Sequence, residues 1–175
     1  MNKLSFVMIK NLLSISIFTV LFVGIFSCQS EVQCNQIPEN SADQTRLEQQ
    51  IQEIESFLES EGIEYQTHSS GIRYSVLESG EGNSPDFCSG VSVDYEGRVL
   101  GEDETFISGI GTDFSLRSNQ VVVGFKIAIS LMNRNADYRL FIPGELLINR
   151  GISNTVPSSI PDGENIEFRV RLNSY

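Results

Sequence analysis

The chain has 175 residues, of which 23 are Asp or Glu and 12 are Lys or Arg, so its formal net charge is -11 at pH 7. Phosphate backbones repel so acidic a surface, and the charge therefore argues against a nucleic-acid-binding protein. The length allows one domain with a hydrophobic core and a short additional segment.

The first 27 residues have the pattern of a secretory signal that ends in a lipoprotein cleavage box. Lys3 and Lys10 accompany an apolar run from Leu12 to Phe26, and a serine comes directly before Cys28. An uncleaved transmembrane anchor is the alternative, but the run is shorter than the roughly 20 residues of a spanning helix. We therefore predict that residues 1–27 are removed and that Cys28 is lipidated. The lipid would anchor the protein in a bacterial cell envelope, with the periplasmic or outer side of the outer membrane as the expected site.

Residues 28–42 are predicted to form a polar tether between the membrane and the domain, because QSEVQCNQIPENSA has no hydrophobic period. Of the two remaining cysteines, Cys34 lies in this tether and Cys88 lies in the globular part. Outside the cytoplasm they could form a disulfide, but two unpaired thiols are an equally good interpretation of the sequence.

Residues 43–62 have the pattern of an amphipathic helix. Its apolar positions form one stripe: Leu47, Ile51, Ile54 and Leu58. Ser41 or Asp43 is the expected N-cap, and Gly62 is the expected stop. The stripe is short for a coiled coil, so packing against the protein's own domain is favoured over a homodimer formed through residues 43–61.

From residue 63 onward the hydrophobic period becomes two, which is typical of strands with one buried face. The alternating segments are Ile72 to Val76, Val91 to Tyr95, Tyr138 to Ile142 and Ile166 to Leu172. Between them, residues 124–132 place Phe125, Ile129 and Met132 on one side of a short helix. We therefore predict that residues 63–175 form an α+β domain in which a strongly twisted antiparallel sheet wraps around one short helix.

The sequence has no catalytic constellation of the usual kinds. Its one histidine, His68, lies in a polar junction and cannot by itself build a triad or a multi-histidine metal site. GEGNSPDFCSG lacks the Lys-Ser/Thr of a phosphate-binding loop, and GEDET lacks the ligand spacing of a calcium loop. We expect no metal and no cofactor, and we expect a hairpin turn at residues 102–104.

Five segments together resemble, in order and spacing, the FKBP-type peptidyl-prolyl cis-trans isomerases. They are GIRYSVLESGEG, VSVDYEGRVLGEDETF, FSLRSNQVVVGFKIAISLM, YRLFIPGELL and SSIPDGENIEFRVRL. The resemblance covers about residues 70–175, and the helix before it is similar to the leader of lipid-anchored members of the family. Asn135 stands where the family usually has a glycine, and asparagine tolerates the same left-handed backbone conformation.

The resemblance implies a pocket that binds the proline ring of a peptide. It assigns catalytic positions to five residues: Tyr95, Phe106, Val122, Phe125 and Phe168. It assigns substrate contacts to five more: Ile107, Phe114, Val121, Ile148 and Ile160. The backbone N–H of Val122 would hold a substrate carbonyl, whereas Phe114 and Val121 are explained as well by ordinary core packing.

The chain departs from the family pattern at three of these positions. Ile107 stands where the family typically has an aspartate, and Phe125 replaces a frequent tryptophan. Ile148, in the loop FIPGELLINRG, stands where the family typically has a tyrosine whose hydroxyl reaches the substrate. The resemblance thus implies that the apolar residues 146–148 belong to a substrate-facing loop. It also implies that isomerase activity is weak or restricted to some proline-containing chains.

These observations predict an envelope-tethered peptidyl-prolyl isomerase that assists the folding of exported proteins. Its partners would be proline-containing polypeptides and, through Cys28, the lipid membrane. A non-catalytic chaperone or binding module, which grips chains with the apolar loop 143–161, is one alternative. A structural lipoprotein that docks on a larger assembly through the helix at 43–61 is another.

Overall fold

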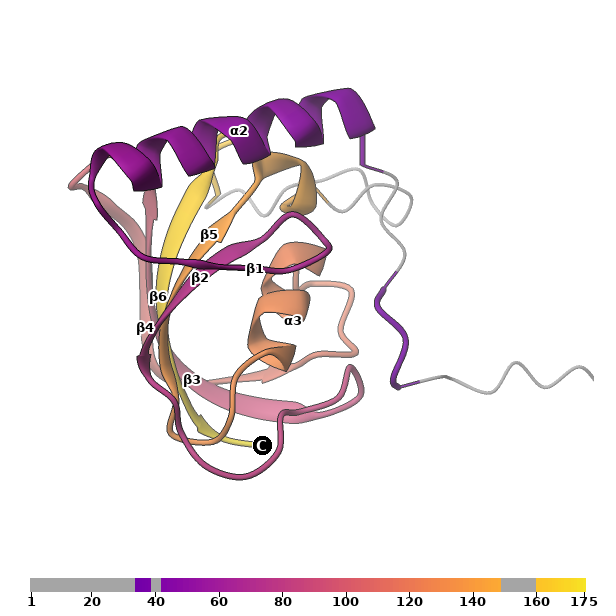
Figure 1. The fold of residues 1–175 in the computed structure, drawn as a ribbon. Helices are drawn as coiled ribbons and strands as arrows, with labels where there is room; N and C mark the ends of the chain where they lie inside the picture. The colour runs from indigo at the N-terminus through magenta and orange to yellow at the C-terminus, as the bar shows by residue number, and fades with distance from the viewer. Residues whose placement is uncertain (1–33, 39–41, 149–159) are drawn as a thin grey trace, which may run out of the picture. The chain divides into compact units, whose positions relative to one another are not determined.

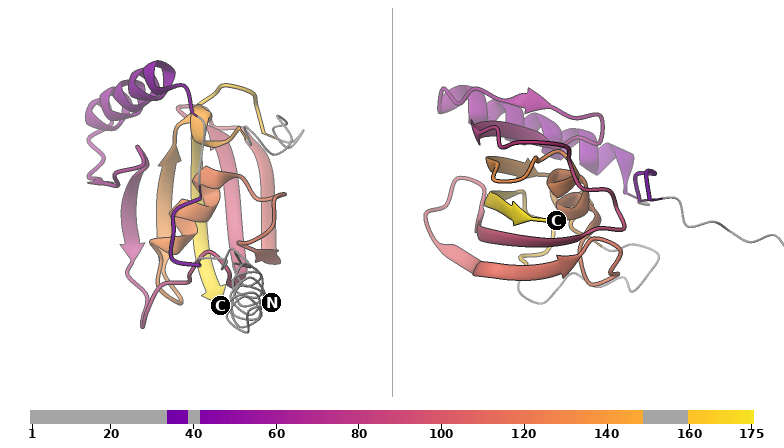
Figure 2. Two further views of the ribbon diagram at one scale, coloured as in Figure 1. Left: turned by 90° about the vertical axis from the view of Figure 1, so that its right-hand side faces the viewer. Right: turned by 90° about the horizontal axis from the view of Figure 1, so that it is seen from below.

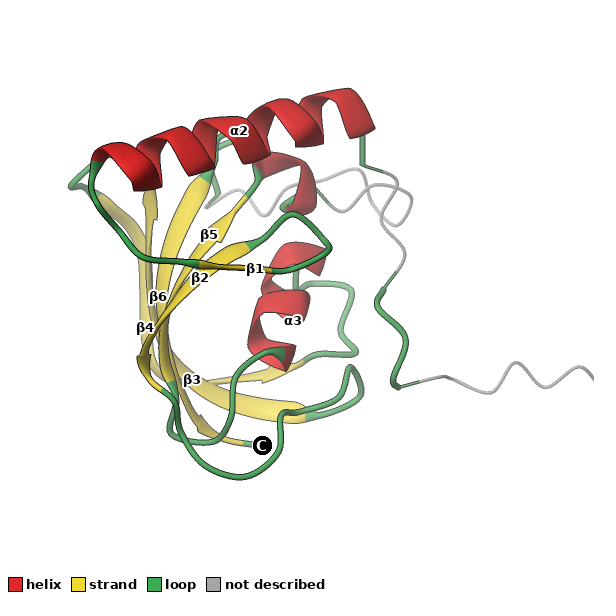
Figure 3. Cartoon of the chain, viewed as in Figure 1, coloured by secondary structure: helices red, strands yellow, loops and turns green. Residues whose placement is uncertain are grey.

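The computed structural model describes residues 34–38, 42–148 and 160–175 (Figure 1). The predicted signal peptide, Cys28 and residues 149–159 lie outside the described residues. Figure 3 marks the helices and strands along the chain. In chain order they are α2 (Gln44–Ser60), β1 (Gln66–Thr67), β2 (Arg73–Glu78), β3 (Gly90–Val99), β4 (Thr105–Ser115), α3 (Val123–Ser130), β5 (Asp137–Ile142), the 3-10 helix η1 (Gly144–Leu146) and β6 (Ile166–Ser174). Within these described segments, no helix has the length and apolarity that crossing a membrane requires.

The strands form one antiparallel sheet in the order β1-β2-β5-β6-β3-β4. The sheet curves around α3, which lies against one face of it, while α2 crosses one end (Figures 1 and 2). Alternation explains which residues face α3: Leu140 and Ile142 on β5 join the main core, as do Val170 and Leu172 on β6. The arrangement confirms the predicted α+β class.

Helix α3 forms the centre of the core. Its residues from Val123 to Ile129 are all buried, as suits a helix enclosed by a curved sheet. The helix begins one residue earlier and ends two residues earlier than the sequence predicts, and Met132 beyond its end is fully buried as well.

Helix α2 begins at the predicted cap. Oδ1 of Asp43 accepts hydrogen bonds from the backbone N–H groups of Thr45 (3.0 Å) and Arg46 (3.2 Å), which have no partner within the helix. After the helix ends, Gly62 has a φ of +65°, a left-handed conformation that favours glycine.

The apolar stripe of α2 packs against the protein's own sheet. Ile54 and Leu58 are fully buried against Phe141, which points away from α3 because it alternates with Leu140 and Ile142 along β5. This contact confirms the favoured interpretation of the stripe, whereas pairing of the helix with a second copy stays a prediction.

Strands β1 and β4 do not appear among the segments that alternation predicts. The register between β3 and β4 shifts between Val93 and Tyr95, and Gly111 has a φ of +57°. These irregularities interrupt the period of two in β4, which is why the sequence pattern does not show the strand. The predicted turn at residues 102–104 does join β3 to β4.

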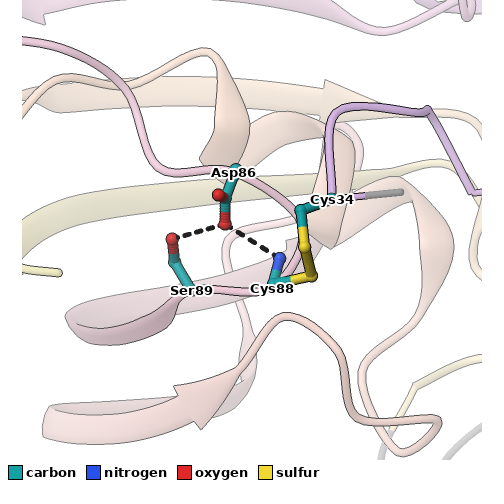
Figure 4. Close-up of a disulfide and its surroundings, with 4 residues drawn as sticks. All are labelled: Cys34, Asp86, Cys88 and Ser89. Atoms are coloured by element: carbon teal, nitrogen blue, oxygen red, sulfur yellow. Dashed lines mark hydrogen bonds between the residues drawn. A yellow bond between two sulfur atoms is a disulfide. The ribbon is translucent and has the colours of Figure 1, made fainter. Parts of the chain in front are cut away.

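Cys34 and Cys88 form a disulfide with their Cα atoms 5.2 Å apart (Figure 4). The backbone N–H of Phe87 also donates to the carbonyl of Cys34 (2.9 Å). On the other side, Oδ1 of Asp86 accepts from the Cys88 N–H (3.0 Å) and from the hydroxyl of Ser89 (2.8 Å). The bridge therefore attaches the start of the described chain to the turn before β3, and it decides between the two interpretations that the sequence left open.

Candidate active site

An apolar pocket opens between α3 and the sheet. Its lining residues are Tyr95, Ile107, Phe114, Gln120, Val121, Val122, Phe125, Ile160 and Phe168. The cavity measures about 150 Å³, and an apolar cavity of that size in another protein holds a benzene ring. The five-membered ring of proline is smaller than benzene, so the pocket has room for it.

Aromatic rings build most of the pocket. Phe125, on α3, contacts the rings of Tyr95 on β3, Phe114 on β4 and Phe168 on β6, with centroids 6.2, 5.9 and 5.4 Å apart. All three contacts are edge to face, the geometry that the charge distribution of aromatic rings favours by about 0.5–1.5 kcal/mol per pair. The floor and walls of the pocket thus hold one another in place.

Glycines on the two neighbouring strands let the walls come together. A Cβ atom on Gly97 would lie 2.5 Å from Cε1 of Phe168 and 2.9 Å from Cγ2 of Ile107. A Cβ atom on Gly109 would lie 2.6 Å from Cε1 of Tyr95. Both distances to ring atoms are shorter than van der Waals contact, so these pocket side chains occupy the space that glycine leaves open.

The backbone N–H of Val122 is a hydrogen-bond donor beside the pocket. Val122 is the N-cap of α3, with an extended backbone, and its side chain lines the pocket. Among the described residues no acceptor lies within hydrogen-bonding geometry of its backbone N–H. This N–H can therefore donate to a carbonyl of a bound peptide.

None of the described lining residues is charged, and the polar side chains among them are those of Tyr95 and Gln120. Lys126, next to Phe125 in α3, is buried, and this burial lowers the pKa of its ammonium group. Within the described part of the chain, no group of three His, Cys, Asp or Glu side chains is placed to hold a metal ion.

Eight of the ten residues that the resemblance assigns to the pocket line it. Phe106 is not among the lining residues, but its ring packs edge-on against Phe168 with centroids 6.3 Å apart. Ile148 is half-buried after η1 and is also absent from the lining. Gln120 lines the pocket although sequence reasoning did not select it, and its position directly before Val121 is the signal that could have found it.

The apolar loop at 143–161 differs from the sequence-based expectation where it is described. Leu146 and Leu147 belong to the hydrophobic core, with 3% and 1% of their surfaces exposed. They cannot face a substrate, because the backbone of η1 turns them inward. Residues 149–159 of this loop lie outside the described part.

Comparison with known proteins identifies relatives for most of the domain. The family model described as "FKBP-type peptidyl-prolyl cis-trans isomerase" matches residues 83–173, more than half of the chain. The peptidyl-prolyl cis-trans isomerase Mip of Coxiella burnetii is 30% identical over 109 residues, which are 61% of this chain and 45% of that protein. The outer membrane protein MIP of Legionella longbeachae is 27% identical over 106 residues, which are 59% of this chain and 43% of that protein. The chain thus spans less than half the length of these curated relatives.

Two crystal structures are similar in fold. A peptidyl-prolyl cis-trans isomerase from Pseudomonas syringae superposes with a TM-score of 0.56 at 22% identity, covering 78% of this chain and 98% of that one. FkpA from Escherichia coli superposes with a TM-score of 0.55 at 26% identity, covering 75% of this chain and 63% of that one. The coverage of this chain extends beyond the match to the family model in both cases.

Proposed function

The chain belongs to the FKBP-type peptidyl-prolyl cis-trans isomerase family, and from this premise we propose that it catalyses rotation about X-Pro bonds of exported polypeptides while tethered to the cell envelope. The observation that carries the proposal is the apolar, aromatic pocket beside the Val122 backbone N–H, which has no acceptor among the described residues.

The chemistry suits a pocket without nucleophiles. Rotation about an X-Pro bond must lose amide resonance, a barrier of roughly 18–20 kcal/mol, and it needs no covalent intermediate. The twisted amide is less dipolar than the planar one, so a pocket that excludes water favours the transition state over the solvated ground state. In this proposal Phe125 and Phe168 enclose the proline ring. The N–H of Val122 orients the peptide by donating to a carbonyl.

Two isoleucines set the expected level of activity. Ile107 adds an apolar side chain to the pocket wall where the family typically has a carboxylate. Ile148 has no hydroxyl to offer a substrate carbonyl, and one hydrogen bond is worth about 0.5–1.5 kcal/mol. Since each 1.4 kcal/mol changes a rate about tenfold, the loss of this hydrogen bond slows the reaction by roughly 2- to 12-fold and leaves it measurable.

The proposed tether is a lipid on Cys28. The disulfide between Cys34 and Cys88 supports a location outside the cytoplasm, where such bonds persist. The printed name of the Legionella relative, an outer membrane protein, supports an envelope location. Cys34 follows Cys28 by six positions, and an extended chain of that length reaches about 20 Å. The bridge would therefore hold the domain close to the membrane surface.

A non-catalytic chaperone or binding module is the second candidate, and Ile107 and Ile148 are the observations that favour it. Such a module would retain the pocket for proline-containing segments without accelerating rotation. Suppression of aggregation of an unfolded protein, with no isomerisation, would select this function.

The deciding experiment measures isomerisation of the peptide Ala-Phe-Pro-Phe by the chain from Gln29 onward. The unaltered protein is compared with the double variant Ile107→Asp, Ile148→Tyr. Ile110→Asp serves as a matched control, because it makes the same change on β4 at a side chain that is 91% exposed. Activity in the unaltered chain supports the proposal, whereas activity that occurs only in the double variant supports the binding module.

A further inference from the structure

A cluster of buried polar groups joins α2 to two segments beside the pocket. Gln50 is only 6% exposed and interrupts the apolar stripe of α2, between Leu47 and Ile54. Its side-chain Oε1 accepts from the backbone N–H of Glu145 in η1 (2.9 Å), and its Nε2 donates to the carbonyl of Gly163 (3.0 Å). One amide therefore bonds two segments that are 18 residues apart in sequence (163 minus 145).

These two segments also meet directly. A Cβ atom on Gly144 would lie 2.8 Å from the carbonyl oxygen of Gly163, so the backbones pack without a side chain between them. Asn165 accepts from the Gly144 N–H through Oδ1 (3.2 Å) and donates through Nδ2 to Oε2 of Glu53 in α2 (3.1 Å). The side chains of Gln50 and Asn165 therefore both link α2 to the place where the two segments meet.

The segment around Gly163 carries a pocket residue on each side. Ile160 lines the pocket three residues before Gly163, and Phe168 lines it three residues after Asn165. A shift of the Gly163 carbonyl would therefore move Ile160, whereas Phe168 is also held by pairing of β6 with β3 and β5. The wall formed by Ile160 therefore belongs to the segment that α2 bonds through Gln50.

We infer that Gln50 is a positioning residue for the pocket: it holds the wall that carries Ile160, and through it α2 sets the affinity for the peptide. The inference rests on the proposed isomerase function. A glutamine is suited to this place because its side chain offers an acceptor for the buried Glu145 N–H and a donor for the half-buried Gly163 carbonyl at once.

The test replaces Gln50 with methionine, which has a similar length but can hydrogen-bond neither the Glu145 N–H nor the Gly163 carbonyl. Gln52→Met is the matched control, because Gln52 lies on the exposed face of α2 and its side chain makes no hydrogen bond to another described residue. The full chain is assayed with Ala-Phe-Pro-Phe, and KM and kcat are measured separately. We expect KM to rise about tenfold in Gln50→Met, with kcat within about twofold of the wild-type value, and we expect both constants to be unchanged in Gln52→Met.

A second readout follows the wall itself. The methyl NMR signal of Ile160 is expected to shift in Gln50→Met, and to need about tenfold more peptide for half-saturation. Gln50→Ala gives the same comparison if the methionine variant does not fold, because its smaller side chain leaves room for water. A folded variant with unaltered KM, unaltered peptide binding and a lower Tm would overturn the inference, since Gln50 would then only stabilise the fold. A wild-type chain that neither binds nor isomerises the peptide would instead overturn the proposed function, and the inference with it.

Discussion

Removal of the disulfide tests how the start of the described chain is held. The change is Cys34→Ser with Cys88→Ser, in the chain from Gln29 onward, which contains no other cysteine. The bridge closes a loop with a sequence separation of 54, and α2, β1 and β2 all lie inside it. The chain-entropy model assigns about 4 kcal/mol to a closed loop of that length, because the bridge restricts the unfolded chain.

The measured loss is expected to be smaller than that limit. One backbone hydrogen bond, from Phe87 N–H to Cys34 O, also holds the segment at residues 34–38. Without the bridge this segment gains freedom in the folded protein too, which offsets part of the effect. We expect the free energy of unfolding to fall by about 2–4 kcal/mol, and Tm to fall by roughly 5–15 °C.

Urea unfolding followed by far-UV circular dichroism measures this difference. The wild-type chain with a thiol reductant should match the double-serine variant, and the variant itself should not respond to the reductant. Neither cysteine lines the pocket, so the kcat/KM of both proteins should agree within about twofold. A loss of stability below about 0.5 kcal/mol, or a wild-type chain that does not respond to reductant, would refute the reasoning.

Three further predictions concern packing, the pocket and pH. Leu58→Ala should lower the free energy of unfolding by about 2–5 kcal/mol, because the Leu58 side chain is fully buried against Phe141. The control Glu59→Ala, at an exposed residue, should change it by less than about 0.5 kcal/mol. Equal urea midpoints for the two variants would contradict the packing of α2. Phe168→Leu should lower kcat/KM for Ala-Phe-Pro-Phe about tenfold, because the ring forms a pocket wall, and an unchanged value in a folded variant would argue against its role. Burial lowers the pKa of His68 below its ordinary value of about 6.5, so the unfolded chain binds this proton more tightly and stability falls as the pH drops below about 6.5. Tm measured from about pH 7.5 to 5.5 should decrease less in His68→Asn than in the wild type, and parallel curves would rule this cause out.

Several features could be predicted because they depend on local chemistry. Asp43 can cap α2 because its carboxylate reaches the free N–H groups of the first turn. Asn135 has a φ of +63°, the left-handed conformation expected where the family usually has a glycine. The alternation of β5 likewise determines that Phe141 points away from Leu140. In each case the relevant neighbours lie within a few residues along the chain.

Other features depend on contacts between distant segments. Leu146 and Leu147 look like part of an exposed apolar loop until η1 turns them into the core. The bonds of Gln50 reach residues 95 and 113 positions away, and no periodicity in α2 shows that its polar side chain is buried. Hydrophobic periodicity does not predict β4 or its irregular register either, because β4 depends on pairing with β3 and not on the β-propensity of its own residues.

Alternating apolar residues and one short apolar helix predicted the fold class, because they permit few ways to bury their faces. The pocket residues were implied by the resemblance to the family. The five ordered segments predicted the family to which the chain belongs. The packed fold was needed to show that Cys34 bonds Cys88, that Gln120 lines the pocket while Phe106 packs on Phe168 outside the lining, and that Gln50 bonds the Gly163 carbonyl. The physical reason is that each of these contacts joins groups whose distance is set by the packing of the whole sheet and not by their separation in the chain.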